Sequence, residues 1–244
     1  MIYAYRSCRG LRPQNEDSIY VPNEGRCPVV IVADGMGGHS SGDIASSIAV
    51  KRIVRFIDSS DGSMGSIVLL RRAINDANRE IFDLSMTEDE YSGMGTTVVA
   101  VLLAPSKYTF AHIGDSRLYH FDGQRLRRVT LDHSYVQELV SAGVITEEQA
   151  KGHPQRNLVT RAVGTSRFEK ADTGVKGWAE GDILMLCSDG LCGAVDDRDA
   201  ERIIKRTDDL LECCDKLVEL ALKNGSTDNI TVVLVKNERG SKND

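Results

Sequence analysis

Short apolar runs rich in β-branched residues recur along the chain, and each of them predicts a β-strand. They cover Val29–Val32, Thr96–Leu103, Tyr108–Ile113, Ile183–Cys187 and Ile230–Val235, with a shorter strand expected at Ser18–Val21. Three other segments repeat apolar residues at helical spacing, which predicts amphipathic helices. Their apolar faces are formed by Val50, Ile53, Val54 and Ile57, by Leu70, Ala73, Ile74, Ala77 and Ile81, and by Leu211, Cys214, Val218 and Ala221.

The order of these elements predicts a sheet system covered by helices. Strands come first, two helices follow in succession, and a long run of strands comes next, before a polar helical stretch, a strand, helices and a last strand. Because strands and helices do not alternate regularly, we expect one domain with a mostly antiparallel sheet system and helices packed outside it. Ser41 and Asp43 suit the start of the first helix, since side-chain oxygens and negative charge favour its exposed amides.

Composition and charge are those of an ordinary folded protein. The chain has 244 residues, of which 41% are apolar and 27% are charged. The net charge of -6 argues against a broad nucleic-acid-binding surface, because such a surface needs a basic face. Arg125, Arg127 and Arg128 form a short basic run, which we interpret as a solvated strand edge.

Cysteine usage and apolar runs predict a cytoplasmic protein without a membrane segment. The six cysteines show no Cys-x-x-Cys pair and no regular framework, which fits reduced thiols. The first residues lack the basic region and apolar stretch of a secretory signal. The longest apolar run, Val98–Ala104, is too short to cross a bilayer as a helix.

Four aspartates share one context, beside a glycine or an asparagine at the end of an apolar strand. They are Asp34, Asp115, Asp189 and Asp228. A carboxylate at the end of a core strand is held rigidly, and a neighbouring glycine lets backbone approach a ligand closely. Asp-Gly is also common turn chemistry, and this is the better interpretation for any one of them alone. Four such positions on strongly apolar strands favour a shared site.

A basic residue and two carboxylates precede the first short strand. The segment runs from Arg12 to Asp17 and includes Glu16. Taken alone, it is best interpreted as a surface salt bridge.

The ordered set of motifs resembles the metal-dependent protein serine/threonine phosphatase family, type 2C. The motifs are Arg12 to Asp17, Asp34-Gly35-Met36-Gly37-Gly38-His39, Gly93-Met94-Gly95-Thr96-Thr97, Gly114-Asp115-Ser116-Arg117, Asp132-His133-Ser134, Ser188-Asp189-Gly190-Leu191 and Thr227-Asp228-Asn229-Ile230-Thr231. They stand in family order and cover nearly the whole chain, which makes the set highly specific. The Gly37-Gly38-His39 form and the short length resemble the bacterial branch.

The resemblance implies an α+β fold: a single four-layer α-β-β-α sandwich with two central antiparallel sheets. Its activity would be hydrolysis of phosphoserine and phosphothreonine in proteins. The phosphatase domain would span residues 1–237, with a flap at about 134–158 and a polar tail at 238–244. Phosphorylated proteins would be the substrates, and a cognate serine/threonine kinase and its targets would be partners by analogy.

The resemblance also implies a role for each matching residue. Asp34 would bridge two metal ions, and the Gly35 carbonyl would ligate one of them. Asp189 and Asp228 would hold the other ion, and Asp115 with Asp189 would hold a weaker third. Glu16 would act near the metals through water, and Asp17 would orient the attacking water. Arg12 would bind the substrate phosphate. These residues are Arg12, Glu16, Asp17, Asp34, Gly35, Asp115, Asp189 and Asp228.

The chemistry of the residues agrees with these roles. So many carboxylates in one pocket would repel each other unless cations neutralise them or some take up protons. Ligand sets made only of oxygen favour hard ions such as Mn²⁺ or Mg²⁺ over zinc. A metal pair about 3.5–4 Å apart can support an in-line displacement at phosphorus. Arginine offers planar, bidentate recognition of phosphate.

Other functions have weaker support. Cys192 and Arg198 have the spacing of a cysteine-based phosphatase, but Asp196 and Asp197 between them would repel a phosphate dianion. The chain contains no Gly-x-x-x-x-Gly-Lys-Ser/Thr loop for a nucleotide. A catalytically silent pseudophosphatase, acting as a binding or scaffold module, is the alternative function, although the matching aspartates are all present.

One departure from the family concerns the general acid. Animal members place a proposed general-acid histidine directly after the metal-ligating glycine, and this chain has Met36 there. Protonation of the leaving group would therefore come from water, from His39 or from another group.

Overall fold

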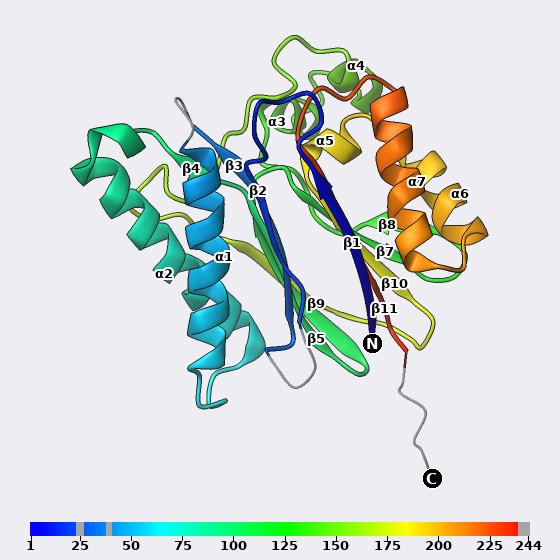
Figure 1. Ribbon diagram of the computed structural model, residues 1–244, viewed down its shortest axis with the longest axis horizontal. Coiled ribbons are helices and arrows are strands. Elements are labelled where there is room, and N and C mark those ends of the chain that lie inside the picture. Colours follow the sequence, from blue (N-terminus) through cyan, green and yellow to red (C-terminus); the bar gives the residue numbers. More distant parts are fainter. Residues whose placement is uncertain (23–26, 38–40, 239–244) are drawn as a thin grey trace.

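The computed structural model describes residues 1–22, 27–37 and 41–238. Within this part of the chain, the strands form two antiparallel sheets that face each other, and helices cover both outer faces (Figure 1). The predicted four-layer α-β-β-α sandwich is thereby confirmed.

The first sheet has the strand order β2-β3-β5-β6-β9, and a short strand β4 pairs with β3. Its strands are β2 (Asp17–Tyr20), β3 (Val29–Met36), β4 (Gly95–Thr96), β5 (Val98–Ala104), β6 (Lys107–Ile113) and β9 (Asp172–Gly177). The second sheet has the order β1-β11-β10-β7-β8. Its strands are β1 (Ile2–Cys8), β7 (Arg117–Phe121), β8 (Leu126–Arg128), β10 (Ile183–Cys187) and β11 (Ile230–Lys236).

Alternation of side chains along the central strands builds the core in three layers. On β3, Ile31 and Ala33 face α1 and α2, whereas Val30 and Val32 face the other sheet. On β10 and β11 the side chains alternate in the same way. One set of side chains faces α6 and α7, and the other set packs between the two sheets. Strands buried on both faces appear in the sequence as continuous apolar runs, which is why they could be predicted.

The helices pack in pairs on the two outer faces (Figure 1). One pair is α1 (Gly42–Asp58) and α2 (Ser66–Thr87), followed by the 3-10 turn η1 (Asp89–Tyr91). The other face carries α6 (Asp197–Arg206) and α7 (Leu210–Lys223). Three short helices lie at one end of the sandwich: α3 (Tyr135–Ser141), α4 (Glu147–Lys151) and α5 (Asp189–Cys192).

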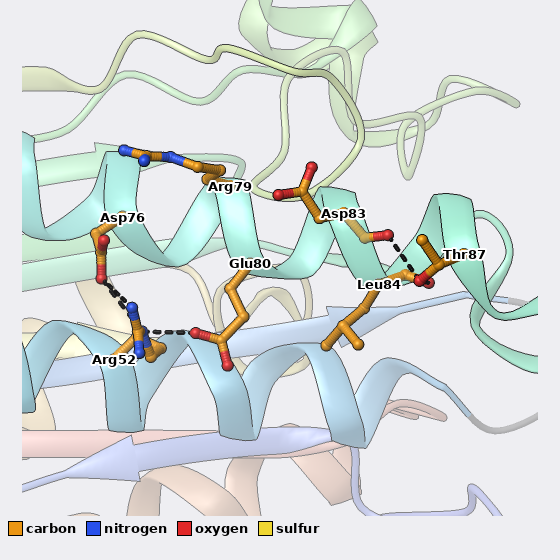
Figure 2. A pocket seen from close by; sticks show the side chains of 7 residues that line it. All are labelled: Arg52, Asp76, Arg79, Glu80, Asp83, Leu84 and Thr87. Carbon is orange, nitrogen blue, oxygen red and sulfur yellow. Dashed lines mark hydrogen bonds and ion pairs between the residues drawn. The ribbon is translucent and has the colours of Figure 1, made fainter.

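The α1–α2 pair is joined at its surface by one arginine. Arg52 of α1 contacts Asp76 at 2.7 Å and Glu80 at 2.6 Å on α2, beside a hollow that is lined by both helices (Figure 2). All three side chains remain partly exposed, so these ion pairs add only modest stability. Packing of the apolar faces, with Ile53 and Ile74 fully buried, is what holds the pair together.

Several sequence-based predictions are corrected in detail. Asp34 does not end its strand, because β3 continues to Met36 and pairs there with β4. Leu211 was assigned to the apolar face of the last helix but is 43% exposed, since Leu210, Cys213 and Leu217 form that face. Strand β1, at the edge of its sheet, was not predicted, because its polar residues break the apolar run.

None of the helices in the described residues combines the length and apolar character needed to span a bilayer.

Candidate active site

Five carboxylates converge at one end of the sandwich, where the two sheets meet. Asp17 and Asp34 come from β2 and β3 of the first sheet. Asp115, Asp189 and Asp228 lie beside the ends of β7, β10 and β11 of the second sheet. Asp34 is close enough to the other four that the charge of each acts on its carboxyl group. The sequence-based expectation that these aspartates share one site agrees with this placement.

The closest approach within the first sheet is imposed by strand register. Asp17 and Asp34 are directly opposite each other in the β2–β3 pair, which is an unfavourable position for two like charges. Asp17 Oδ2 accepts a hydrogen bond from Ser188 Oγ at 2.8 Å. Asp17 Oδ1 is buried and has no hydrogen-bond partner among the described residues. A buried carboxylate oxygen without a donor is costly, and it indicates a position where a ligand or water belongs.

Crowding and burial hold protons on several of these groups. Burial, followed by the charges of Asp17, Asp189, Asp115 and Asp228, raises the pKa of Asp34 well above its ordinary value. Burial also raises the pKa of Asp17 to about 7, and that of Asp115 to about 8. Burial and the neighbouring Asp228 raise the pKa of Asp189, while a hydrogen bond with Asp34 lowers it. At neutral pH, these groups share protons when no cation neutralises them.

Two glycines allow the segments of the site to touch. A Cβ atom on Gly35 would lie 2.0 Å from the Gly42 carbonyl oxygen and 2.7 Å from that of Glu16. A Cβ atom on Gly190 would lie 2.0 Å from the Asn229 carbonyl oxygen. Both positions therefore require glycine, because a side chain would push backbone segments apart. The site glycines serve close packing of backbone in addition to any role towards a ligand.

Arg12 and Asp228 form an ion pair at the mouth of the site. The Arg12 Nη2 atom donates to Asp228 Oδ2 at 2.7 Å, and the guanidinium group is half-exposed. Hydrogen bonding to Asp228, followed by the charges of Asp228, Asp189 and Glu16, raises the pKa of Arg12. The salt bridge expected from the sequence is present, but its partner is a carboxylate of the site and not a neighbour in the N-terminal segment.

Asn229 fixes the loop that carries Arg12 and Glu16. Its Oδ1 atom accepts from the Glu16 backbone N–H at 2.8 Å, and its Nδ2 atom donates to the carbonyl oxygens of Arg9 and Gln14, each at 2.9 Å. The sequence motif contained Asn229 without suggesting this role. A single buried amide thus holds the N-terminal loop against the end of β11.

Two threonines hold the backbone of Asp34. Thr96 Oγ1 donates to the Asp34 carbonyl oxygen at 2.9 Å, and Thr97 Oγ1 accepts from the Asp34 N–H at 3.0 Å. Thr97 Oγ1 also lies 2.7 Å from Ser116 Oγ, next to Asp115. This chain of hydroxyl groups links the two sheets directly beneath the carboxylates.

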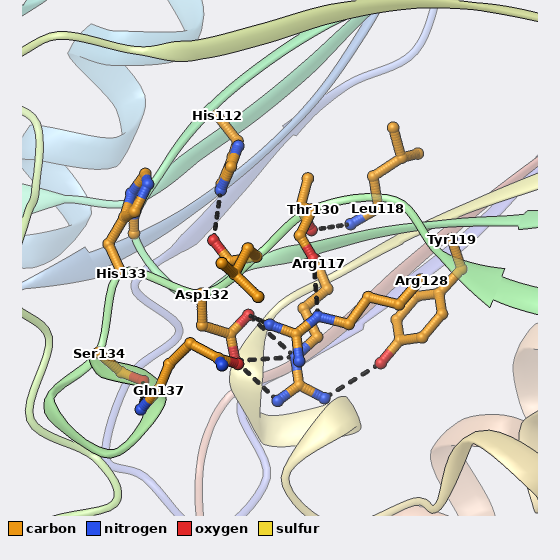
Figure 3. A network of polar contacts seen from close by, with 12 residues as sticks. His112, Arg117, Leu118, Tyr119, Arg128, Thr130, Asp132, His133, Ser134 and Gln137 are labelled. Atoms are coloured by element: carbon orange, nitrogen blue, oxygen red, sulfur yellow. Dashed lines mark hydrogen bonds and ion pairs between the residues drawn. The ribbon is translucent and has the colours of Figure 1, made fainter. Parts of the chain in front are cut away.

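The turn that carries Asp115 is held by a buried network (Figure 3). Gly114 adopts a left-handed conformation with φ of 104°, and its N–H donates to His133 Nδ1 at 3.0 Å. Arg117 donates to Asp132 through Nε and Nη2, the latter at 2.7 Å, and Nη1 donates to the Tyr119 hydroxyl oxygen at 3.1 Å. The aspartate and histidine of the Asp132-His133-Ser134 motif therefore position the Asp115 turn, and Ser134 begins α3 as its N-cap.

The carboxylates are not arranged as a preformed metal-ligand group. Among the described residues, no three His, Cys, Asp or Glu side chains stand in such an arrangement. One of them, Asp228, is instead paired with Arg12. His39, one of the expected proton donors, lies outside the described residues, and Met36 ends β3.

The cysteine alternative fits the structure poorly. Cys192 ends the short helix α5. Its interaction with the Cys187 thiol, followed by burial, raises the pKa of Cys192 well above its ordinary value, which is the opposite of what a nucleophilic thiol requires. Arg198 lies on the exposed surface of α6.

Comparison with known proteins decides the family. The sequence profile of protein phosphatase 2C matches residues 6–224. The chain belongs to the protein phosphatase 2C family. The family and enzyme class predicted from the sequence, a metal-dependent protein serine/threonine phosphatase of bacterial type, are thereby confirmed.

Relatives match over almost the whole chain. It is 39% identical to the serine/threonine phosphatase stp of Listeria monocytogenes over 249 residues, which cover 98% of this chain and 96% of the relative. A crystal structure of the Mycobacterium tuberculosis serine/threonine phosphatase PstP/Ppp superposes with a TM-score of 0.90 at 36% identity, covering 98% and 99% of the two chains. A structure of the PstP catalytic domain with two manganese ions gives a TM-score of 0.86 at 35% identity, covering 96% and 97%.

Carboxylate repulsion predicts a pH dependence of stability for the phosphatase without metal. A carboxyl group whose pKa is raised by folding stabilises the fold while protonated, so this contribution is lost as pH rises from about 4 to the folded pKa, about 8 for Asp115. Asp115→Asn removes this carboxyl group, and with it the loss of stability as pH rises. In chelator, the variant should gain free energy of unfolding relative to wild type between pH 5 and pH 8, on the order of 1–3 kcal/mol, measured by urea unfolding. Asp208→Asn, at an exposed position, is the control. Parallel curves for Asp115→Asn and wild type would contradict the prediction.

Proposed function

We propose that this chain hydrolyses phosphoserine and phosphothreonine in proteins, with two divalent cations held by the convergent carboxylates. The observation that carries the proposal is the cluster around Asp34, where burial and four neighbouring negative charges raise the pKa of the carboxyl group. Family membership supplies the enzyme class, and the related PstP structure contains two manganese ions.

The residues present fit a pair of hard cations. The candidate ligands are oxygen atoms, which favour Mn²⁺ or Mg²⁺. Asp34, the Gly35 carbonyl group, Asp189 and Asp228 are the proposed ligands of two tightly bound ions, and Asp115 with Asp189 is the proposed holder of a weaker third. Bound cations would replace the protons that these groups otherwise retain. When bound, the ions supply neutralising charge and Lewis-acid activation of water at the phosphate ester.

Asp17 and Glu16 are proposed to act on water. The buried Oδ1 atom of Asp17 lacks a partner among the described residues, whereas Oδ2 is fixed by Ser188. This leaves one oxygen of a rigid carboxylate free to accept a hydrogen bond from the attacking water and to orient it. The Glu16 side chain lies against Gly42 at the start of α1, where an added Cβ atom would come within 2.9 Å of Glu16 Oε2.

Arg12 is proposed to bind the substrate phosphate. Its guanidinium group is exposed at the mouth of the site and already pairs with an anionic oxygen of Asp228. If Asp228 serves as a metal ligand, the guanidinium group is available for the phosphate oxygens, which it can bind in a bidentate manner.

In the proposed reaction, the water oxygen bonds to phosphorus and the bond from phosphorus to the seryl or threonyl oxygen breaks. A proton from water, or from another donor, passes to that leaving oxygen. The products are inorganic phosphate and the free hydroxyl side chain.

The alternative is a pseudophosphatase that binds partners without catalysis. It is disfavoured because every aspartate proposed for the site is present and converges with the others. Phosphorylated proteins remain the proposed partners, together with a cognate serine/threonine kinase by analogy. The proposed domain spans residues 1–237, and of the expected tail at 238–244 only residue 238 belongs to the described part of the chain.

A flap at about 134–158 also remains a proposal, and two backbone hydrogen bonds near its ends support it. The Tyr135 N–H donates to the Leu158 carbonyl oxygen, and the Thr160 N–H donates to that of His133, both at 2.9 Å. Between these anchors the segment contains only the short helices α3 and α4, and its middle is exposed. A segment tied at its base and exposed at its tip is suited to contact a protein substrate.

Metal dependence is the first functional prediction. Chelation should abolish hydrolysis of a phosphothreonine peptide, and Mn²⁺ or Mg²⁺ should restore it. Asp189→Ala should lower kcat by roughly a thousandfold or more, because the metal activates the nucleophile.

Asp115→Ala should retain tight metal binding in calorimetry while losing turnover. Thiol alkylation should leave most activity. Full activity in chelator would sink the proposal, and the pseudophosphatase predicts no turnover under any of these conditions.

For Arg12, the prediction separates binding from turnover. Arg12→Ala should raise KM for the phosphopeptide about tenfold with a smaller fall in kcat, because the guanidinium contacts phosphate in both ground and transition states. Arg9→Ala is a matched control on the same loop, since Arg9 is exposed and has no acidic partner among the described residues. An unchanged KM for Arg12→Ala would show that Arg12 serves only the pair with Asp228.

The flap prediction compares two substrates. Glu138→Ala and Gln155→Ala change exposed flap residues, whereas Gln137, also expected at the surface, is half-buried and is left intact. Turnover of a phosphoprotein should change several-fold more than that of p-nitrophenyl phosphate, which needs only the metal site and Arg12. Glu219→Ala on α7 is the control. Equal changes in kcat/KM for both substrates would show that this segment is a passive connector.

A further inference from the structure

A strongly basic hollow lies on the face of the molecule that carries α6. It has a volume of about 630 Å³ and lies between α6 and the β7–β8 turn, two segments that Figure 1 shows side by side on the flank opposite α1 and α2. Its lining consists of Arg125, Arg198, Glu201, Arg202, Lys205 and Arg206. Five of the six lining residues are basic, in a protein whose net charge is -6.

The acidic groups nearby offset only part of the positive charge of this hollow. Glu201 is committed to the fold, because its Oε2 atom accepts from the Leu126 N–H at 2.7 Å and thereby joins α6 to β8. Asp199 pairs with Arg202 at 2.9 Å. Within the described part of the chain, the other basic side chains of the hollow have no ion pair; they are Arg125, Arg198, Lys205 and Arg206.

Helix stability explains only part of this arrangement. Lys205 and Arg206 stand in the last turn of α6, where positive charge favours the helix dipole. Arg198 stands in the first turn, where positive charge is unfavourable. Arg198, Arg202 and Arg206 also follow one another at a spacing of four residues on one helix face, so their charges repel. A bound anion would relieve this repulsion.

We propose that this hollow docks an acidic segment of the phosphoprotein substrate, outside the catalytic centre. Arginine side chains bind carboxylates in bidentate geometry, and several of them in one hollow select a run of Asp and Glu. The proposal rests on the proposed phosphatase function and adds a determinant of substrate choice to it.

The position of the hollow suits a substrate that also reaches the catalytic centre. Asp196, the N-cap residue of α6, contacts Lys151 of α4 at 2.7 Å, and Asp197 accepts from the Tyr119 hydroxyl at 2.9 Å. The first turn of α6 therefore adjoins the proposed flap, and the hollow extends from there along the helix.

The lining favours a protein segment over other polyanions. It contains no aromatic side chain on which nucleic-acid bases could stack, and no aliphatic one that could enter a lipid surface. A long polyanion would also be repelled by the net negative charge of the rest of the molecule. A short acidic peptide avoids both difficulties.

The test compares a neutralised hollow with a matched control. Arg125→Gln/Arg198→Gln/Lys205→Gln removes positive charge from the hollow without touching the active site. Lys51→Gln/Arg55→Gln/Lys107→Gln removes the same charge from exposed positions elsewhere. Each Mn²⁺-loaded enzyme is assayed on a phosphothreonine peptide with a Glu-rich extension, on the same peptide with a Gln-rich extension, and on p-nitrophenyl phosphate.

Wild type should prefer the Glu-rich peptide in kcat/KM by about tenfold at low salt, and this preference should shrink as salt rises. The hollow variant should lose the preference, and its turnover of p-nitrophenyl phosphate should stay within about twofold of wild type. The control variant should keep the preference. Anisotropy with an unphosphorylated Glu-rich peptide measures docking without catalysis and should show weaker binding only for the hollow variant.

Equal preference in wild type and the hollow variant would overturn the docking site while leaving the phosphatase function intact. Absence of phosphopeptide turnover by Mn²⁺-loaded wild type would instead refute the proposed function and the substrate docking with it. Tighter binding of duplex DNA or phosphatidylserine vesicles than of the Glu-rich peptide would also overturn the assignment to a protein segment.

Discussion

Repulsion among buried carboxylates is the constraint on which the rest of this structure depends. The register of β2 against β3 sets Asp17 directly opposite Asp34, and the ends of the second sheet bring further carboxylates beside them. Such a cluster cannot be ionised and stable at the same time unless positive charge enters it. The raised pKa values of the aspartates, which favour their protonated forms, and the guanidinium group of Arg12 meet this need in part. The chemistry proposed for the enzyme uses the same unfavourable electrostatics, because cations that neutralise the cluster are the ones that activate water.

The scaffold resists this repulsion by fixing backbone and not side chains alone. Gly35 and Gly190 let neighbouring segments come into backbone contact, Asn229 clamps the N-terminal loop, and the threonine hydroxyls of the β4–β5 segment hold the backbone of Asp34. These contacts are short in range but join segments that are far apart in sequence. They explain why functional motifs are spread over nearly the whole chain, although the site itself is small.

The sequence predicted the central architecture well because both sheets are buried on both faces. Ile183–Cys187 was predicted with the bounds of β10, since every residue in it is apolar and buried. Edge strands such as β1 and β9 mix polar and apolar residues and give no comparable signal. In the site, the aspartates could be found from strand ends and from the family resemblance. Asn229 and Ser188 stand in the quoted motifs, but their roles could not be predicted, because amide and hydroxyl groups occur everywhere and only the fold brings them to Glu16 and Asp17. The partner of Arg12 was missed for the same reason.

Charge is distributed over the molecule in a way that separates two tasks. Negative charge gathers at the end of the sandwich, where it selects cations, and it would repel an acidic substrate approaching without them. Positive charge gathers in the hollow beside α6, a helix whose N-cap residue Asp196 contacts Lys151 of α4. A substrate chain that carries acidic residues beside its phosphorylated side chain would therefore have its acidic residues attracted to the hollow. The negative charge of its phosphate would be neutralised by the cations at the carboxylate site. Because the two regions lie on different elements, substrate preference can change through α6 without altering the carboxylates. This division is available to the fold because its helical layers pack against the sheets through apolar faces, which leaves the outer surface of α6 free to vary.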